Sequence, residues 1–558
     1  MRLVRITSIE EFKDYQHDWS SLLEEKQNTN PFIEFPWIYE WWKHIGQEKS
    51  VEIIAVEDNS RFIAFLPLVI QKKWFGDCYT FVAFGDANYM DIIALNHQLE
   101  IVIEFIFDQI MSEKKNVVFH FHGLLESSKT SAFLEAYLQI RNSNYSIHRV
   151  ITPYIDLQKI KLSEYIDKRQ KLHRLSRREK RLRASGQIEM LQSDDSEIDS
   201  IFMIHNKQWK KKNDTSGFTN KKKKDLFQSL ININTGPLKT KIDSLYLNDK
   251  MIAFSYGFVC RGRYLSYMLG YDDNFEVFSP GRILEKETIL KYKHANLEKF
   301  DLSIGYEPYK FDWNTHIDFT RTIVFASNST VAKIRRSILS RKELFKGNVK
   351  KNYRLVLFKR NSLGKLSYLM KNLFNKNEMS GVYKEIVSFI KKVKDFLYFN
   401  KKYLIYKIDR NSLGELPDAN EFLEVTLNDA LLEINEDNHI KEINKKIYGG
   451  YVGYYPKGKL TFNNIIWTNE KVLRIEEIFY IENFRKRSVY VDSWAVGDLK
   501  KVCSLVKKNT NGKDLYVAIK HNAKKRIMEL ESAGFIFHKY VKKKVFLGNE
   551  KTITKGVT

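Results

Sequence analysis

The spacing of apolar and polar positions changes several times along this chain, and the clearest succession of predicted elements lies between residues 263 and 310. Positions 263–271 alternate with a period of two in a stretch rich in aromatic residues, which predicts a β-strand. Ser-Pro-Gly-Arg follows at 279–282, and apolar residues at helical spacing then predict a helix that begins at Pro280. A short strand over 300–304 completes a predicted strand, loop, helix and strand.

Patterns of the same two kinds predict an α/β arrangement on both sides of this stretch. Helices are expected over 9–25, 35–46, 99–112, 131–141, 166–184, 201–212 and 226–233, and strands over 51–56, 61–73, 79–84, 91–95, 117–121, 188–191, 239–247 and 251–259. The turn at 248–250 is a hairpin signal between the last two strands. The expected fold class is therefore α/β with a mixed sheet.

Two features of the first 150 residues have both a structural and a functional interpretation. Trp37, Trp41 and Trp42 form either a buried face of one helix or a platform for a ligand. His120 and His122 share one face of a predicted strand, which suits a pair of metal ligands. No third ligand is apparent, so no metal is expected.

The net charge of +24 over 558 residues favours anionic partners, such as coenzyme A, sugar nucleotides, lipid phosphates or nucleic acid. No zinc, helix-turn-helix or RNA-binding motif supports nucleic acid. The helix over 166–184 carries its cations opposite a narrow apolar seam, either as a solvated face or as a guide for a phosphate-bearing acceptor. Residues 331–400 hold 18 Lys and Arg against 4 Asp and Glu, and an amphipathic helix over 386–397 suits either an anionic membrane or packing on flanking domains.

Cysteine usage and apolar runs indicate where the protein resides. Cys78, Cys260 and Cys503 show neither a disulfide framework nor zinc spacing, which fits a reducing cytoplasm. The first residues lack the apolar core of a signal peptide, and the longest apolar run, 62–70, is too short to span a membrane. We expect a cytoplasmic protein, with attachment to the inner face of the membrane through 331–400 as an alternative.

The helix start at Pro280 has two interpretations. A helix N-terminus presents free N–H groups and partial positive charge, and Gly281 and Arg282 would help it to hold a phosphate. Alternatively, Ser279 and Pro280 only cap the helix.

A family resemblance is carried by these residues. GYDDNFEVFSPGRILEKETI followed by FDLSIGYEPYK resembles the acetyltransferase domain of the cellulose-biosynthesis CelD type, a branch of the GNAT superfamily of Gcn5-related N-acetyltransferases. The resemblance runs from about residue 162 to 325. It implies a mixed α/β fold, acetyl-CoA or another acyl-CoA as donor, and an amine or hydroxyl acceptor.

The resemblance also implies a donor site. In GNAT domains the acyl group lies between two splayed strands, and the pyrophosphate binds at the N-terminus of the next helix. The residues expected to hold the donor are Tyr267, Ser279, Pro280, Gly281 and Arg282.

Transfer to an amine requires a base that takes the acceptor proton, and the leaving thiolate is helped by an acid. Candidates for the base are Asp272, Asp301 and Glu307, although aspartates at strand ends also serve as turn residues. Tyr271 and Tyr309 are candidates for the acid. Trp209, Phe218 and Lys310 are expected to contact the acceptor.

Two further parts resemble GNAT units. Residues 1–155 resemble a degenerate half of the kind paired in tandem Fem peptidyltransferases, where the first half supplies a wall of the acceptor cleft. LYVAIKHNAKKRIMELESAGFIFHKYVKKKVFL resembles the closing GNAT motif. The phosphate loop expected before it has Arg485-Lys486-Arg487 followed by Ser488, not glycines, so this unit binds coenzyme A poorly or through side chains.

The sequence thus predicts a degenerate half (1–155), a GNAT acyltransferase domain (156–330), a basic helical linker (331–400) and a third, GNAT-like domain (401–548). The expected function is N-acyl transfer, in the first place of acetyl, to an amino group of a sugar or cell-surface polysaccharide precursor. Two alternatives stay open. One is a Fem-like aminoacyl transfer from charged tRNA, and the other is a scaffold without catalysis that binds glycan or membrane.

Overall fold

The structure is a computed structural model, and the residues that it describes form two compact units. The described residues are 1–74, 76–161, 164–165, 170–193, 195–210, 220–233, 236–351, 398–409, 422–434, 436–458, 460–484, 488–493, 499–509, 514–546 and 549–556. Unit 1 comprises Met1–Arg177, Glu189–Asp272 and Pro280–Ser367, and unit 2 comprises Arg178–Ile188, Asp273–Ser279 and Tyr368–Thr558. Each unit is described by itself.

The described strands of unit 1 form one large mixed sheet. They are β1 (Arg2–Ile6), β2 (Val51–Asp58), β3 (Arg61–Lys73), β4 (Gly76–Phe81), β5 (Ile93–Ala94), β6 (Val117–Leu125), β7 (Tyr145–Asp156), β8 (Ile188–Ser193), β9 (Lys239–Leu247), β10 (Lys250–Cys260), β11 (Arg263–Tyr271), β12 (Lys299–Asp301) and β13 (His316–Ala326). Their order is β1-β2-β3-β4-β6-β13-β7-β12-β11-β10-β9-β8, and β5 pairs with β3. The mixed α/β fold class predicted from the sequence is confirmed.

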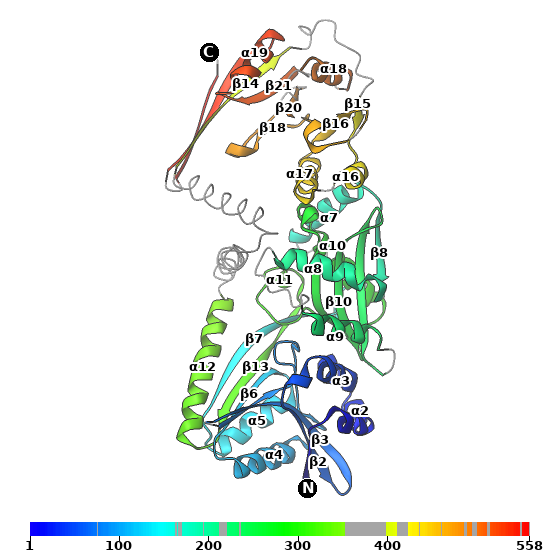
Figure 1. Ribbon diagram of the computed structural model, residues 1–558, viewed down its shortest axis with the longest axis vertical. Coiled ribbons are helices and arrows are strands. Elements are labelled where there is room, and N and C mark those ends of the chain that lie inside the picture. The colour runs from blue at the N-terminus through cyan, green and yellow to red at the C-terminus, as the bar shows by residue number, and fades with distance from the viewer. Residues whose placement is uncertain are drawn as a thin grey trace. The chain divides into compact units, whose positions relative to one another are not determined.

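The centre of this sheet shows that two halves exchange strands. β4 and β6 are parallel neighbours in the first half, and β11 and β12 are parallel neighbours in the second. β13 comes from the second half but lies antiparallel to β6, whereas β7 comes from the first half but lies antiparallel to β12 (Figure 1). The halves 1–155 and 156–330 are therefore interleaved within one compact unit.

Helices cover this sheet on both faces. They are α1 (Ile9–Asp14), α2 (Gln16–Glu25), α3 (Phe35–His44), α4 (Leu99–Glu113), α5 (Lys129–Ile140), α7 (Gln170–Arg183), α8 (Ile198–Lys210), α9 (Lys221–Ile231), α10 (Pro280–His294), α11 (Lys310–Trp313) and α12 (Thr330–Lys351). Phe107 of α4 packs on Phe119, Phe121 and Phe325 of β6 and β13. α12 lies against β6, β13 and β7 (Figure 1). It packs on residues such as Val118, which alternate along β6 with those that contact Phe107.

Most predicted helices and strands are present with shifted ends. The helix expected over 9–25 is broken at Tyr15, which separates α1 from α2. Trp37, Trp41 and Trp42 are buried, so the interpretation of α3 as a buried helix face is confirmed. The sequence analysis did not predict β1, β7 or β13. The amphipathic helix expected over 386–397 lies outside the described residues.

Unit 2 contains a second sheet and repeats the plan of the second half. Its strands are β14 (Tyr398–Ile408), β15 (Phe422–Glu424), β16 (Val452–Pro456), β17 (Ile466–Asn469), β18 (Val472–Ile475), β19 (Tyr480–Asn483), β20 (Ser488–Ser493), β21 (Asp514–Lys520), β22 (Ile536–Phe546) and β23 (Asn549–Gly556), and its helices are α16 (Leu427–Glu433), α17 (Asp437–Tyr448), α18 (Leu499–Asn509) and α19 (Lys524–Ser532). The sheet order is β15-β16-β17-β20-β21-β14-β22-β23, with β18 and β19 as a separate hairpin. β20 and β21 are parallel, and β14 lies antiparallel to β21 as β7 does to β12.

Candidate active site

The parallel strands β11 and β12 differ in length at their carboxyl ends. They pair only from Arg263 to Leu265 of β11, and β12 ends at Asp301 while β11 continues to Tyr271. In α/β sheets, ligands bind outside the carboxyl ends of the strands. The part of β11 beyond Leu265 therefore has no partner in β12, at the edge where the resemblance predicts the acyl group.

Helix α10 begins at Pro280, as predicted, shortly after the end of β11. Ser279 precedes it with a φ of 58°, a left-handed conformation that is uncommon for residues other than glycine. The Ser279 hydroxyl accepts a hydrogen bond from the Arg178 guanidinium of α7. The basic helix therefore brings a positive charge to the residue before the start of α10.

Gly281 lies against the ring of Tyr271, which explains the need for glycine. A Cβ at this position would lie 3.2 Å from Cδ1 of Tyr271, so a larger side chain would displace the ring. Pro280 and Gly281 are buried, whereas Ser279 and Arg282 on either side are partly exposed. Solvent therefore reaches the first turn of α10 at its flanking residues.

Arg282 retains donor capacity beside this helix start. Its Nη2 lies 2.9 Å from Oδ2 of Asp312, and its guanidinium lies 5.7 Å from the ring centre of Trp313. Its Nε is buried and has no hydrogen-bond partner among the described residues. A buried donor without a partner is costly, and an anionic ligand would supply the missing acceptor.

Glu285 is a buried carboxyl one helical turn after Gly281, and the sequence analysis missed it. Trp313 of α11 donates its indole N–H to Oε2 of Glu285. Burial raises the pKa of Glu285 to about 8, although the positive charges of Arg282 and Lys310 oppose this shift. The signal in the sequence was an acidic residue on the apolar face of a helix, which is rare unless the group has a role or a partner.

Tyr309, Lys310 and Glu307 gather on the neighbouring segment before and within α11. Lys310 is buried; its Nζ donates to the carbonyl of Ile304 at 2.6 Å and lies 3.1 Å from Oε2 of Glu307. Burial, together with the charges of Glu285 and Glu307, raises the pKa of Tyr309 well above its usual value. Tyr309 therefore keeps its proton at neutral pH, and its raised pKa makes it a weak acid.

Asp301 forms a buried ion pair with Arg263 and accepts a hydrogen bond from the hydroxyl of Tyr89 at 2.9 Å. Burial alone would raise its pKa, but the charges of Arg263 and Lys299 and the backbone N–H of Ser303 hold the pKa below its usual value. Such a carboxylate is a weak base. Its contacts suit the positioning of β12 against β11 and the first half.

Asp272 follows the last residue of β11 and is buried. Its Oδ2 lies 3.7 Å from Nζ of Lys250, and its backbone N–H donates to the carbonyl of Ile252. Tyr271, beside it, is partly exposed and covers Gly281. Of the three carboxylates predicted as bases, Asp272 is the one nearest in sequence to the end of β11.

Tyr267 connects β11 with a loop of the first half. Its hydroxyl donates to the carbonyl of Asp86 at 2.6 Å, and its ring packs against Phe32, Phe227 and Phe258. The Asp86 carboxylate accepts a hydrogen bond from the indole of Trp41 at 3.1 Å and lies 2.7 Å from Nζ of Lys223.

The sequence analysis missed Asp86. Its signal was a Gly-Asp step directly after a strand, in the first half where no site was sought. The backbone of Trp209 lies in the last turn of α8, but its side chain is not described. Phe218 is outside the described residues.

The corresponding strand pair of the first half is filled by its own chain. The backbone N–H of Met90 donates to the carbonyl of Gly123, and a Cβ on Gly123 would lie 2.9 Å from the carbonyl of Asn88. Phe84 packs edge-on against His122 at 4.3 Å between ring centres. Burial lowers the pKa of His122 to about 3, and no group of three metal-ligating side chains was found among the described residues.

In unit 2 the structure corrects the predicted phosphate loop. Ser488, Val489 and Tyr490 lie in strand β20, which pairs with β21. The helix between β20 and β21 is α18, which the structure describes from Leu499, so the predicted loop residues Ser488 to Tyr490 lie before it in a strand. The valines alternate with Ser488 and Tyr490 as in a strand, and the basic run before them misled the sequence analysis.

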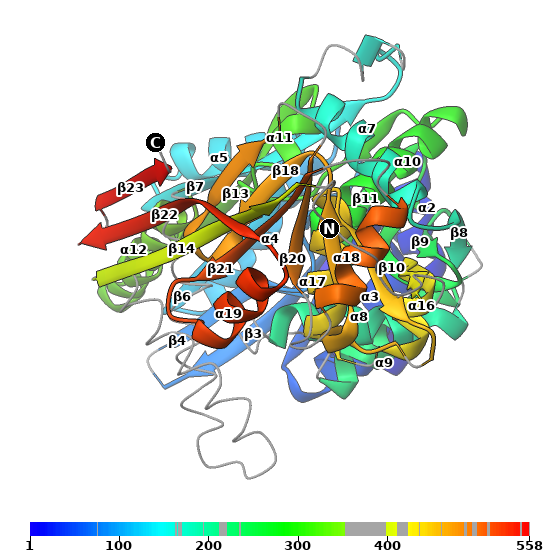
Figure 2. The ribbon, with the colours of Figure 1, turned by 90° about the horizontal axis from the view of Figure 1, so that it is seen from above.

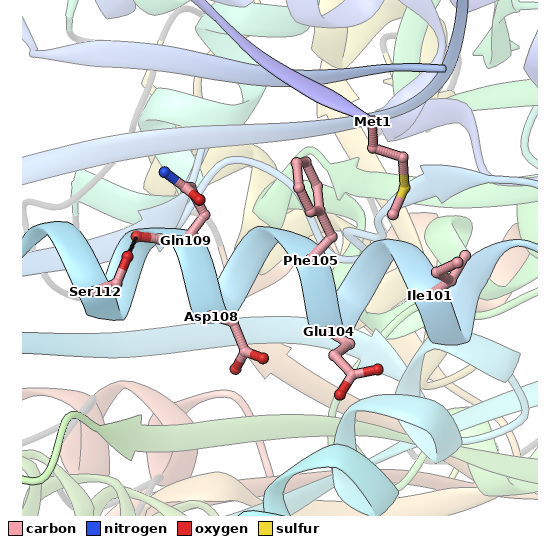
Figure 3. A pocket seen from close by; sticks show the side chains of 7 residues that line it. All are labelled: Met1, Ile101, Glu104, Phe105, Asp108, Gln109 and Ser112. Carbon is pink, nitrogen blue, oxygen red and sulfur yellow. Dashed lines mark hydrogen bonds between the residues drawn. The ribbon is translucent and has the colours of Figure 1, made fainter. Parts of the chain in front are cut away.

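Three cavities lined by described residues lie away from these positions in the chain. One of about 420 Å³ lies along α4, where Figure 3 shows Phe105 and Met1 on one side of the helix and Glu104 and Asp108 on the other. A second, of about 350 Å³, is lined by β8 and the later turns of α10, and a third, of about 640 Å³, lies in unit 2. None is lined by Tyr271, Asp272 or the first turn of α10.

No helix within the described ranges is long and apolar enough to cross a membrane.

A parallel strand pair of unequal length, followed by a helix with a Pro-Gly start, is an arrangement of the GNAT type. The comparison with family models agrees: residues 169–311 match the model described as acetyltransferase (GNAT) domain. The resemblance stated from the sequence is confirmed for this segment, and the match supports acyl transfer in general. A search of curated proteins found no match.

Solved structures with a similar fold include tandem GNAT and Fem proteins. The crystal structure of FemX is 9% identical, with a TM-score of 0.40 over 57% of this chain and 97% of that chain. A tandem GNAT protein from the clavulanic acid biosynthesis pathway is 8% identical, with a TM-score of 0.33 over 59% of this chain and 100% of that chain. The C-terminal domain of a lysylphosphatidylglycerol synthetase homologue from Agrobacterium fabrum is 10% identical, with a TM-score of 0.38 over 60% and 97%.

Proposed function

We propose that the chain transfers an acyl group, in the first place acetyl, from acyl-CoA to an amino group of a sugar or cell-surface polysaccharide precursor. The observation that supports this most directly is the start of α10. Ser279 and Arg282 are partly exposed at the helix start, and Arg282 carries a buried Nε without a described hydrogen-bond partner. A diphosphate satisfies both features, since it needs close backbone approach and accepts charge-assisted hydrogen bonds.

The chain's own residues then divide the work. Ser279 to Arg282 hold the donor, which supplies an activated acyl thioester when bound, and Tyr267 and Tyr271 flank the path along β11. Tyr309, the acid predicted from the sequence, donates a proton to the leaving thiolate in this proposal.

The acceptor side combines residues of both halves. Asp86 is fixed by Trp41 and Lys223 and orients the acceptor, while Asp272 takes the amine proton. The predicted contact of Lys310 with the acceptor requires its Nζ to leave Glu307 and the carbonyl of Ile304. Asp86→Asn is then expected to lower kcat by about 10-fold to 100-fold with little change in donor affinity.

Binding of acetyl-CoA, measured by calorimetry on the purified chain, tests the donor site. Gly281→Trp is expected to abolish binding because the new side chain displaces Tyr271. Gly347→Trp on α12 is the matched control, since nothing lies within 4 Å of a Cβ there. Release of free thiol with a panel of amino sugars then tests the chemistry, and binding that survives in Gly281→Trp would refute the donor site.

A second candidate is aminoacyl transfer from a charged tRNA. The contact from Arg178 of the basic helix α7 to Ser279 supports it, because an extended row of arginines suits a polyanion better than a single diphosphate does. Retention of tRNA by the chain, together with no binding of acetyl-CoA, would favour this candidate over the first.

A further inference from the structure

One face of the ribbon formed by β14, β22 and β23 in unit 2 carries an unusual set of lysines. The three strands run side by side (Figure 2), and their register places residues of each strand in rows across the ribbon. Asn400, Lys544 and Lys551 form one row, and Lys402, Lys542 and Ile553 form the next. Lys555 lies opposite Tyr540 in the row after that. We name this set the lysine face: Lys402, Lys542, Lys544, Lys551 and Lys555.

The lysine face is not neutralised by the described part of the chain. None of its five lysines forms an ion pair with a described residue, although Lys402 lies 4.2 Å from the ring centre of Tyr540. The opposite face of the same strands differs. There Lys401 lies 2.9 Å from Glu477, and Lys543 lies 2.8 Å from Glu550.

Two pairs of like charges stand directly opposite each other on the lysine face. Lys402 is the register partner of Lys542, and Lys544 is the register partner of Lys551. Like charges in such positions destabilise a sheet. On the opposite face the like-charge pair of Lys401 and Lys543 is neutralised by Glu477 and Glu550, whereas neither pair of the lysine face has such a described partner, which indicates that an anionic partner neutralises the lysine face.

The neighbouring residues indicate which anionic partner fits. Tyr398 and Phe546 are register partners at the end of the ribbon, and 59% and 65% of their surfaces are exposed. Exposed aromatic residues beside lysines are typical of surfaces that bind at the boundary between lipid headgroups and acyl chains. The basic segment 331–400 also ends two residues before Lys402.

We propose that the lysine face, with Tyr398 and Phe546 at its end, binds the surface of a membrane that contains anionic phospholipids. The strands are about 4.8 Å apart and alternate residues on one strand about 7 Å apart, so the charges form a compact, nearly flat patch. Each lysine near such a surface improves partition by about fivefold.

Co-sedimentation of the full chain with vesicles tests this proposal. One set of vesicles is phosphatidylcholine, and the other is an equal mixture of phosphatidylcholine and phosphatidylglycerol. The test variant carries Lys→Gln at 542, 544, 551 and 555, and the control variant carries Lys→Gln at four exposed positions elsewhere: Lys13, Lys72, Lys73 and Lys457. Both variants lose the same net charge.

The wild-type chain and the control are expected to bind the anionic vesicles and not the neutral ones. The test variant is expected to bind up to about a thousandfold more weakly, from about fivefold per lysine. Its melting temperature should not fall, because the substitutions remove cross-strand repulsion. Equal loss in both variants, or no loss in either, would overturn the proposal, as would retention of a single-stranded oligonucleotide by the lysine face without vesicle binding.

Discussion

Replacing Glu285 by glutamine will change how the stability of unit 1 depends on pH. Glu285 is 3% exposed, and burial raises its pKa from the usual 4.5 to about 8. The folded chain therefore holds this proton at pH values where the unfolded chain has released it. As a result, the free energy of unfolding contributed by this group is complete below pH 4.5 and is lost as the pH rises towards 8.

The size of the effect follows from the shift in pKa. Each unit of pKa is about 1.4 kcal/mol, so the free energy of unfolding of the wild-type chain should fall by roughly 3 kcal/mol between pH 4.5 and 7 on account of Glu285. Glutamine keeps the acceptor oxygen for the indole of Trp313 and cannot ionise. Glu285→Gln should therefore be more stable than the wild type at pH 7 and equal to it near pH 4.5.

Urea denaturation at several pH values between 4.5 and 8 measures this difference, with hydrogen exchange of peptides from α10 to assign the transition to unit 1. Glu287→Gln, two residues further along the same helix and partly exposed, is the control and should keep the pH dependence of the wild type. If Glu285→Gln and the wild type lose stability equally as the pH rises, the carboxyl is ionised in the fold and the reasoning is wrong.

Three further predictions follow from other parts of unit 1. Arg282→Met should weaken acetyl-CoA binding by about 10-fold to 100-fold, which is the usual contribution of a hydrogen bond to a charged group. Calorimetry measures this, with the exposed Arg61→Met as the control, and equal affinity of both variants would contradict a role of Arg282 in donor binding. Arg263→Ala should destabilise unit 1 by about 3–5 kcal/mol because it leaves Asp301 buried and unpaired. In thermal denaturation, the double variant Arg263→Met, Asp301→Leu should recover most of this loss. An unchanged melting temperature in the single variant would show that the ion pair does not contribute to stability. Burial lowers the pKa of His122 to about 3, so His122 stays neutral in the fold while the unfolded chain gains a proton below pH 6.5. The free energy of unfolding should therefore fall by about 1.4 kcal/mol per pH unit between pH 6.5 and 3. In denaturation experiments His122→Leu should reduce this acid sensitivity and the exposed His97→Leu should not, and equal acid sensitivity in all three chains would contradict the lowered pKa.

The local elements around the candidate site could be predicted because their signals are local. The alternation along β11 and the Pro-Gly start of α10 each lie within one element, and both are observed. The burial of Trp37, Trp41 and Trp42 follows in the same way from spacing within a single helix.

The exchanged strands could not be predicted in this way. β7 and β13 pair with each other over ten residues, from Tyr145 to Tyr154, although they are far apart in the chain. Neither has a clean alternation: the first residues of β7 are mostly half-exposed, and Pro153, a residue that argues against a strand, lies within it. Their pairing depends on the other half of the unit, so no pattern within either segment predicts it.

The chemistry of the buried groups was also beyond the sequence. Asp272 and Asp301 lie at the ends of predicted strands and Glu285 lies within a predicted helix, but the sequence alone does not show which of these carboxyl groups is ionised. Their surroundings determine this: burial raises the pKa of Glu285, whereas the pKa of Asp301 is lowered because the charges of Arg263 and Lys299 outweigh its burial. Arg263 and Asp301 belong to different strands, so their pairing appears only once β11 and β12 lie side by side.

The role of the first half follows from where its loop after β4 lies. The equivalent loop in the second half leads to a helix with a glycine at its start, but here the loop packs back onto β6 through Met90 and Gly123 and leaves no separation for a donor. The same loop extends to the second half, where Tyr89 bonds Asp301 and the carbonyl of Asp86 receives the hydroxyl of Tyr267. Because these two hydrogen bonds tie the loop to the second half, substitutions at Asp86 or Tyr89 are expected to affect the second half's chemistry.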